Sequence, residues 1–205
     1  KEMASKIFAK GFQINTHCIG DSAVRLIIAT YNNLHDFNES MNFEYNRKVE
    51  LRWRIEHFQV STKNDIDLLS HFNILEKQDY RLIPSIQSTH ATSDMYWAKD
   101  RLGEERVKYA YAYKDLLKAA GIVALGTDFP VENINPMYTF YAAVARKDLK
   151  GFPKGGFQME NALTREETLK GRLHKTCQVD SCPFLKRKTL ELQEFKQYKY
   201  PQEFE

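Results

Sequence analysis

The sequence predicts an α/β fold in which four strand–helix units form one parallel sheet. Short apolar runs alternate with segments that carry apolar residues at helical spacing, and this alternation is typical of βα units. A residue able to ligate a metal follows three of the runs, at His17, His57 and Asp128. The four expected strands cover residues 12–16, 51–56, 81–86 and 122–125.

Length and composition narrow the class of protein. The 205 residues are enough for one sizeable core, and 42% hydrophobic with 13% aromatic residues is typical of a globular protein. The net charge is only +3, and Lys and Arg are scattered among acids. This is not the charge pattern of a nucleic-acid-binding protein. No apolar run approaches the roughly 20 residues that span a bilayer, and three cysteines are too few for a disulfide framework. We therefore expect a cytoplasmic protein with no nucleic-acid or membrane partner.

The helices of the first half are marked by apolar spacing and by their end signals. A helix over residues 2–10 is expected to end at Gly11. The next helix opens at Asp21, after the first strand. A capping box over residues 62–65 starts the helix that follows the second strand.

The second half contains the longest stretch without a clear period. Residues 87–103 are polar and aromatic and predict a long functional loop, with Trp97 partly buried, over the face that carries the three ligands. Helices are expected over 105–120 and over 136–146, the latter with Pro at its first position. A second capping box, at residues 164–167, starts the last expected helix.

The joint placement of His17, His57 and Asp128 is more informative than any one of them. A single His or Asp at a strand end is more often a hydrogen-bonded structural residue. Because the carboxyl ends of parallel strands meet at one edge of the sheet, these three side chains are expected to converge. Imidazole and carboxylate groups ligate Zn²⁺ in catalytic sites, where the ion lowers the pKa of bound water to about 7. His90 could touch substrate or cap its loop.

Four motifs lie at or after the expected strands: THCIGDSA at 16–23, RIEH at 54–57, PSIQSTHATSDM at 84–95 and GTDFPVE at 126–132. They resemble consecutive motifs of amidohydrolase family 3, in particular its YtcJ-like members, which include N-substituted formamide deformylases. The resemblance extends from about residue 11 to residue 171, and it also includes Asn-Pro-Met at 135–137 and Leu-Thr-Arg-Glu-Glu at 163–167.

The resemblance implies a fold and a chemistry. The family has a metal-dependent (β/α)₈ barrel, so this chain would be a partial TIM-like barrel made of strands five to eight. His17 and His57 would be metal ligands, Asp128 both a ligand and the catalytic acid, and Gln87 and His90 would line the substrate pocket. The expected cofactor is a divalent metal ion, and zinc is the expected ion. The expected substrate is a small amide or formamide rather than a peptide.

The chain also departs from the family pattern. The His-x-His of the first strand and the fourth-strand ligand are absent, since the chain is expected to begin in the helix before strand five. Residues 172–205 do not resemble the family, so we divide the chain into a half-barrel, 1–171, and a non-matching tail, in which Cys177 and Cys182 form a weak candidate metal pair. The alternative function is a non-catalytic, truncated half-barrel fragment of such an enzyme. Because the first-strand and fourth-strand ligands are absent and four strands of eight leave open edges, we expect the chain alone to be inactive and to aggregate or associate with itself. A barrel phosphoesterase is a third possibility.

Overall fold

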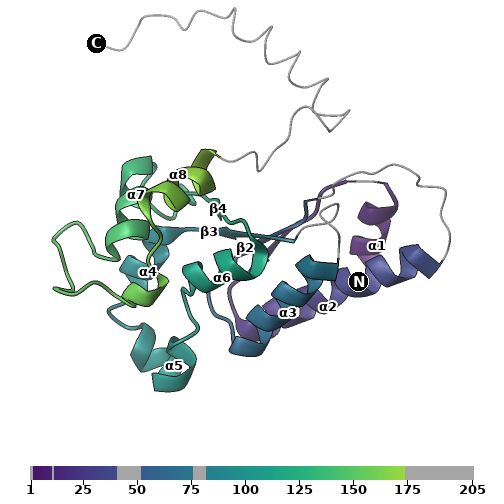
Figure 1. Cartoon of the computed structure of the whole chain (residues 1–205), viewed down its shortest axis with the longest axis horizontal. Coiled ribbons are helices and arrows are strands. Elements are labelled where there is room, and N and C mark those ends of the chain that lie inside the picture. The colour runs from purple at the N-terminus through teal and green to yellow at the C-terminus, as the bar shows by residue number, and fades with distance from the viewer. Residues whose placement is uncertain (1, 11, 41–51, 76–81, 174–205) are drawn as a thin grey trace, which may run out of the picture. The chain divides into compact units, whose positions relative to one another are not determined.

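A parallel sheet is the centre of the fold. The computed structural model describes residues 2–10, 12–40, 52–75 and 82–173. Within these ranges four strands pair in chain order, β1-β2-β3-β4, and every pair is parallel (Figure 1). Parallel neighbours need a crossover connection, and helices supply it here, so the predicted α/β class with a parallel sheet is confirmed. The strands are β1 (Asn15–Cys18), β2 (Arg54–His57), β3 (Ile83–Ile86) and β4 (Ala124–Leu125).

The first strand begins later than the sequence pattern indicated. Pairing starts where Asn15 lies opposite Arg54, so residues 12–14 precede β1. Phe12, which was expected inside the strand, is 51% exposed. As a result His17 lies within β1 instead of following it.

Several helices begin where local capping signals predict. Thr62 and Asp65 exchange the reciprocal hydrogen bonds of a capping box before α3. Thr164 and Glu167 do the same before α8. Asn135 caps α7, where its side chain accepts a backbone hydrogen bond of 3.0 Å. These helices and their neighbours are α1 (Glu2–Ala9), α2 (Asp21–Ser40), α3 (Lys63–Leu75), α6 (Tyr113–Ala120), α7 (Pro136–Ala145), the 3₁₀ helix η1 (Met159–Asn161) and α8 (Arg165–Leu173).

The stretch 87–103, which was expected to be a loop, is mostly helical. It contains α4 (Ser88–Asp94) and most of α5 (Ala98–Val107), which is kinked at Gly103, where φ is +76°. No apolar stripe marks α4; its first five residues are instead buried by the surrounding chain, so tertiary contacts determine this helix. Trp97 is 47% exposed, and the prediction of its partial burial is wrong.

The single helix expected over 105–120 is interrupted between α5 and α6. In the interruption Ala110 forms an antiparallel bridge with Val60. The backbone N–H of Tyr111 donates to the carbonyl of Gln59 at 2.7 Å. These pairings with the chain after β2 replace the helical hydrogen bonds that the periodicity alone would favour.

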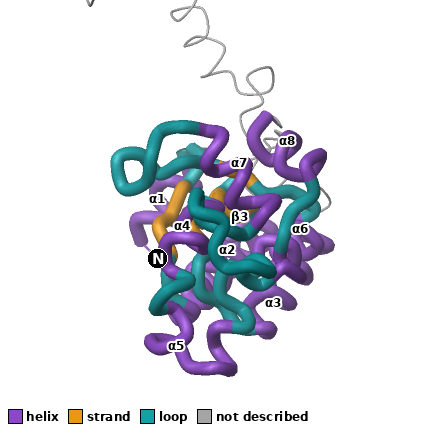
Figure 2. Tube along the Cα trace, turned by 90° about the vertical axis from the view of Figure 1, so that its left-hand side faces the viewer, coloured by secondary structure: helices purple, strands orange, loops and turns teal. Residues whose placement is uncertain are grey.

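The apolar core lies between the sheet and the helices beside it. Ile55 of β2, Ile86 of β3, Leu69 of α3 and Leu116 of α6 are fully buried in one cluster. Helix α3 contacts both α2 and α6, and α6 contacts β3 (Figure 1). Figure 2 shows the strands lying among the helices and loops. No helix in the described part of the chain has the length and apolar character needed to cross a membrane.

The expected boundary at residue 171 falls inside α8, which continues to Leu173. Residues 174–205, with both Cys177 and Cys182, lie outside the described residues. The division into a half-barrel and a tail therefore stays a prediction.

Candidate metal centre

Two of the predicted ligands leave the sheet at neighbouring strand ends. His57 is the last residue of β2, and Asp128 follows the end of β4 after Gly126 and Thr127. Both have a positive φ, +71° and +60° respectively, a backbone conformation that costs a residue with a side chain about 1–2 kcal/mol. The carbonyl of Asp128 accepts the backbone N–H of Val131 at 2.8 Å, which fixes the turn. Such strained positions concentrate at functional sites.

Three side chains converge at this edge of the sheet. One ligand atom from each of His57, His90 and Asp128 lies within 4.8 Å of the others. The Nε2 atom of His90 is 3.4 Å from Oδ2 of Asp128. The rings of His57 and His90 are stacked with centroids 5.4 Å apart and planes inclined by 14°. Both histidines are buried at 8% exposure, whereas Asp128 is partly exposed.

His17 lies beside this cluster and is not one of its three members. Its ring meets the ring of His57 edge-on, with centroids 4.4 Å apart and an interplanar angle of 72°. Unlike the other two histidines, His17 is exposed. The structure thus brings His57 and Asp128 together as the sequence predicts, places His17 against His57, and adds His90 to the group.

Gln87 and His90 belong to the same strand-end face. Gln87 caps α4 directly after β3, and its carbonyl accepts the backbone N–H of His90 at 3.1 Å. The buried hydroxyl of Tyr113 donates to the same carbonyl at 3.0 Å. A Cβ atom at Gly126 would lie 4.0 Å from the Gln87 side-chain nitrogen, so Gln87 reaches the end of β4. The stretch after β3 therefore faces the ligand cluster, as the sequence predicts.

The electrostatic environment of His57 favours the neutral imidazole by lowering its pKa. Burial is the largest effect that lowers the pKa of His57, and the neighbouring His17 and His90 lower it further. Asp128 opposes them and raises the pKa, but by less than burial lowers it. A neutral imidazole is the form that ligates a metal ion.

Unpaired buried atoms show that the donor set fits a metal ion. Within the described residues, Nδ1 of His57 and Nε2 of His90 have no hydrogen-bond partner although both are buried. Leaving such a group unsatisfied costs about 1–3 kcal/mol. A divalent ion held by two imidazoles and a carboxylate would satisfy both atoms, and this combination of ligands suits zinc-like ions.

Other polar residues near the site hold the chain together. The carboxylate of Asp94 accepts hydrogen bonds from Gln59 at 2.6 Å and from Tyr111 at 2.8 Å. Glu56 forms an ion pair of 2.7 Å with Arg54 on its own strand. These contacts give Asp94 and Glu56 structural roles.

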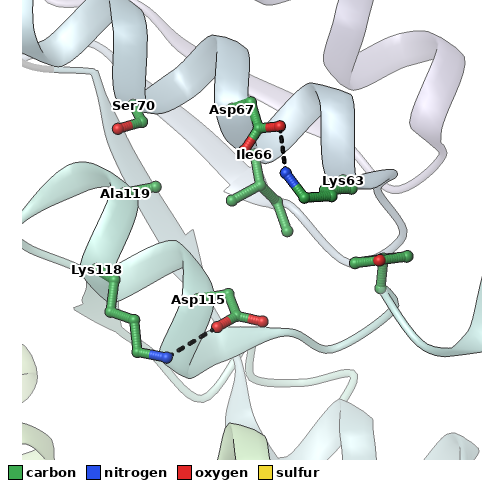
Figure 3. Close-up of a pocket in the computed structure, with 8 residues that line it drawn as sticks. Lys63, Ile66, Asp67, Ser70, Asp115, Lys118 and Ala119 are labelled. Atoms are coloured by element: carbon green, nitrogen blue, oxygen red, sulfur yellow. Dashed lines mark hydrogen bonds and ion pairs between the residues drawn. The ribbon is translucent and has the colours of Figure 1, made fainter.

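A cleft of 360 Å³ lies away from this cluster, between α3 and α6 (Figure 3). Ion pairs at its walls join Lys63 to Asp67 at 2.6 Å and Lys118 to Asp115 at 3.1 Å. None of the ligand residues lines it, so we do not assign the chemistry to this cleft. Its lining residues are Lys63, Ile66, Asp67, Ser70, Tyr109, Asp115, Lys118 and Ala119.

The fold and the site together define an α/β protein with a histidine–carboxylate cluster at the ends of parallel strands. The profile of the amidohydrolase family, Amidohydro_3, matches residues 1–170. The chain therefore belongs to the amidohydrolase family.

Individual relatives agree with this assignment. The chain is 31% identical to Protein LONG AFTER FAR-RED 3 of Arabidopsis thaliana over 66% of this chain and 21% of that protein. It is 28% identical to the putative amidohydrolase YtcJ of Bacillus subtilis over 67% of this chain and 22% of that protein. The chain thus spans about a fifth of the length of these curated relatives.

Solved structures share the fold. An uncharacterized metal-dependent hydrolase from Pyrococcus horikoshii matches with a TM-score of 0.62 and 27% identity, over 87% of this chain and 32% of that one. A second uncharacterized metal-dependent hydrolase, from Pyrococcus furiosus, matches with a TM-score of 0.64 over 87% of this chain and 31% of that one. At 23% identity the second likeness concerns the fold alone.

Proposed function

We propose that this chain carries strands five to eight of a metal-dependent barrel that hydrolyses C–N bonds in small amides or formamides, and not in peptides. The convergence of His57, His90 and Asp128 at neighbouring strand ends is the observation that carries the proposal. Barrel enzymes place their catalytic groups at this end of the sheet. Membership of the amidohydrolase family supports the hydrolytic chemistry.

Zinc is the proposed ion. Catalytic zinc sites combine three protein ligands, often imidazole and carboxylate, with an open position for the reactants. The family resemblance assigns His17, His57 and Asp128 to the ion, and the structural cluster contains His57, His90 and Asp128. His57 and Asp128 are common to both sets. When bound, a divalent ion supplies a Lewis acid that polarises a carbonyl and acidifies water.

Asp128 is the proposed proton carrier. Its side chain is 31% exposed, so its carboxylate can face the buried histidines and also a substrate that enters from solvent. In hydrolysis a C–O bond forms as water attacks the carbonyl carbon, and the C–N bond breaks. Asp128 accepts the proton released by the water and returns it to the leaving nitrogen.

Gln87 is proposed to bind the substrate. Its Oε1 atom is buried and, within the described residues, has no hydrogen-bond partner. A side-chain carbonyl in this state is suited to accept the N–H of an amide or formamide. Because Gln87 leads directly into α4, its position is coupled to that of His90.

A second candidate function is a non-catalytic half-barrel. Among the described strands β1 pairs only with β2 and β4 pairs only with β3, so both edges of the sheet are open. Open edges recruit further strands, and a chain of this kind would associate with itself and hold metal weakly.

Metal content and hydrolysis distinguish these candidates. Purified chain 1–205 is stripped with chelator, reloaded with Zn²⁺, and assayed on N-formyl amines, N-acetyl amines, dipeptides and phosphate monoesters. The proposed function predicts near-stoichiometric zinc and turnover of formyl or acetyl amides that Asp128→Asn abolishes. The matched variant Asp67→Asn, at an exposed site on α3, serves as the control.

Each alternative gives a different result in the same assays. Stoichiometric zinc without turnover, or weak zinc binding, would favour the non-catalytic half-barrel. Turnover of phosphate monoesters alone would contradict cleavage of C–N bonds.

A further inference from the structure

A closed set of three hydrogen bonds, here called the Asp94 triangle, joins Gln59, Asp94 and Tyr111. The Oδ2 atom of Asp94 accepts the side-chain amide of Gln59 at 2.6 Å and the hydroxyl of Tyr111 at 2.8 Å. The backbone N–H of Tyr111 donates to the carbonyl of Gln59 at 2.7 Å. Three segments that are distant in the sequence therefore meet at one carboxylate: the segment after β2, the last residue of α4, and the interruption before α6.

Two of these segments carry the stacked histidines of the strand-end site. Gln59 follows His57 by two residues, and Asp94 follows His90 by about one helical turn. The rings of His57 and His90 stack with centroids 5.4 Å apart and planes inclined by 14°. We propose that Asp94 is a positioning residue, which holds the turn after β2 against α4 and thereby keeps the two imidazole rings face to face. As a role in catalysis this rests on the proposed function; as a property of the fold it does not.

The backbone around the Asp94 triangle adopts a conformation that needs support. His57, Phe58 and Tyr111 have positive φ values of 71°, 43° and 55°. Residues with a side chain stay in this region only where the surrounding structure holds them there. The hydrogen bonds that Gln59 and Tyr111 donate to Asp94 act on both of these turns. The strained turn that carries His57 is thus fixed by a contact with α4 as well as by its own strand.

Helix α4 depends on anchors of this kind. It is only seven residues long, Ser88–Asp94, and isolated helices of this length are not stable. Its first end is held by Tyr113, whose hydroxyl donates to the carbonyl of Gln87 at 3.0 Å. Its last residue is Asp94, to which Tyr111 donates. Because the two tyrosines are two residues apart, one short segment holds both ends of α4, and loss of Asp94 releases the end that follows His90.

Diethyl pyrocarbonate, which acylates accessible neutral imidazoles, tests the proposal at each histidine. Chelator-treated chain 1–205 is modified briefly under native conditions, and mass spectrometry of its peptides gives each rate relative to that of the exposed His71. Without substitutions, His57 and His90 should react slowly, since both are buried at 8% exposure. Asp94→Ala should raise both rates about 10–100-fold, because loss of hydrogen bonds to a charged group shifts a local opening equilibrium by this factor.

Two further variants separate positioning from general stability. Asp94→Asn keeps a side-chain oxygen that can accept both hydrogen bonds, so its rates should rise by no more than about 3-fold. Asn73→Ala removes hydrogen bonds of 2.9 and 3.3 Å to the backbone of Leu82, which precedes β3 at the end of that strand opposite Gln87. Asn73→Ala should lower the free energy of unfolding in urea, as Asp94→Ala does, and yet leave both buried histidines protected.

Tyr111→Phe covers the case in which Asp94→Ala does not fold, as judged by circular dichroism. It removes one hydroxyl from the Asp94 triangle and should raise the rates at His57 and His90 about 5-fold. Unchanged rates in Asp94→Ala, or in Tyr111→Phe where Asp94→Ala does not fold, would overturn the proposal. An equal rise in Asn73→Ala or in Asp94→Asn would do the same. So would a rise at only one of the two histidines, because the proposal requires both segments to loosen together.

This measurement needs neither a metal ion nor a substrate, so the two proposals fail in different ways. If the rates change as expected but no amide is hydrolysed, the proposed function fails, and Asp94 still holds the two histidines together. If amides are hydrolysed while Asp94→Ala leaves both histidines protected, the positioning role fails and the proposed function stands.

Discussion

The hydroxyl of Tyr113 donates a 3.0 Å hydrogen bond to the backbone carbonyl of Gln87, the residue that joins β3 to α4. Tyr113 is buried at 1% exposure and comes from the first position of α6. The same carbonyl accepts the N–H of His90. A residue of the helical layer thus holds the segment that carries His90 of the candidate site.

Tyr113→Phe tests whether this hydrogen bond positions the site. Loss of one buried hydrogen bond should lower the free energy of unfolding by about 1 kcal/mol, measured by urea denaturation. Because α4 then loses one of its anchors, zinc affinity should fall as well. Tyr141→Phe, at an exposed position on α7, should change neither. Unchanged zinc affinity in Tyr113→Phe, with reduced stability, would limit Tyr113 to a structural role.

Arg146 is a second buried anchor, at the end of α7. It is fully buried, and its guanidinium lies 5.0 Å from the ring centroid of Tyr113. Its Nε atom donates to the carbonyl of Phe157 at 2.8 Å, and Nη2 donates to the side chain of Gln158 at 3.1 Å. The planar guanidinium makes these contacts in one fixed geometry.

Arg146→Lys should therefore be destabilising although the positive charge is kept. A lysine ammonium cannot make both hydrogen bonds and stack on the ring, so we expect a loss of about 1–3 kcal/mol in the free energy of unfolding. The exposed Lys150→Arg in the following loop should be neutral. Equal stability of Arg146→Lys and the unmodified chain would show that charge alone matters at this position.

Three buried tyrosines predict how stability depends on alkaline pH. Burial raises the pKa of Tyr31 from 10.0 to about 12, and burial also raises the pKa values of Tyr111 and Tyr113. A folded pKa above the unfolded value means that the folded state binds more protons between the two values. The contribution of these protonated tyrosines to the free energy of unfolding is complete below pH 10. It is lost as pH rises through the folded pKa values.

Urea denaturation between pH 8 and pH 11 measures this dependence. The free energy of unfolding should fall above pH 10, and the fall should be smaller in Tyr31→Phe. Absorbance at 295 nm should show these tyrosines ionising only together with unfolding. A free energy of unfolding that stays constant up to pH 11 would show that the pKa values of these hydroxyls are not raised in the folded state.

Local signals in the sequence were sufficient to predict much of the fold. The capping residues Thr62 and Thr164 start helices as predicted because both partners of each capping box lie within four residues of chain. Strand order followed from the βα alternation, since consecutive parallel strands with helical crossovers usually lie side by side. Neither inference needed information about distant parts of the chain.

Features that depend on distant contacts were not predictable in the same way. Helix α4 has the sequence STHATSD, without apolar periodicity, and is buried by its surroundings. That segment was expected to be a loop, in which His90 could touch substrate or cap the loop. The structure places His90 on α4, in the same cluster as His57 and Asp128. The break before Tyr111 depends on pairing with Gln59, which is far away in sequence.

The open edge of β1 leads to a prediction about association. The backbone N–H of Arg54 donates to the carbonyl of Ile14 at 2.9 Å, so Ile14 faces β2. Backbone groups alternate along a strand, and those of Asn15 therefore point away from the described sheet. After β4, Phe129 and Val131 are 61% and 74% exposed. Apolar surface beside an unpaired edge favours pairing with another chain.

We propose that purified chain 1–205 associates with itself through these edges. Light scattering after gel filtration measures the mass of the associated species. Asn15→Pro removes the outward N–H at an edge position that tolerates proline, so it should shift the chain toward monomer at micromolar concentration. Leu26→Lys, which removes an exposed apolar side chain from α2 (60% exposed) without touching either edge, is the control and should associate as the unmodified chain does. Covering one large apolar side chain contributes about 1.5–3 kcal/mol, so Val131→Lys should weaken association further. A chain that is monomeric at all concentrations, or one in which Leu26→Lys has the same effect as Asn15→Pro, would contradict pairing at the edges.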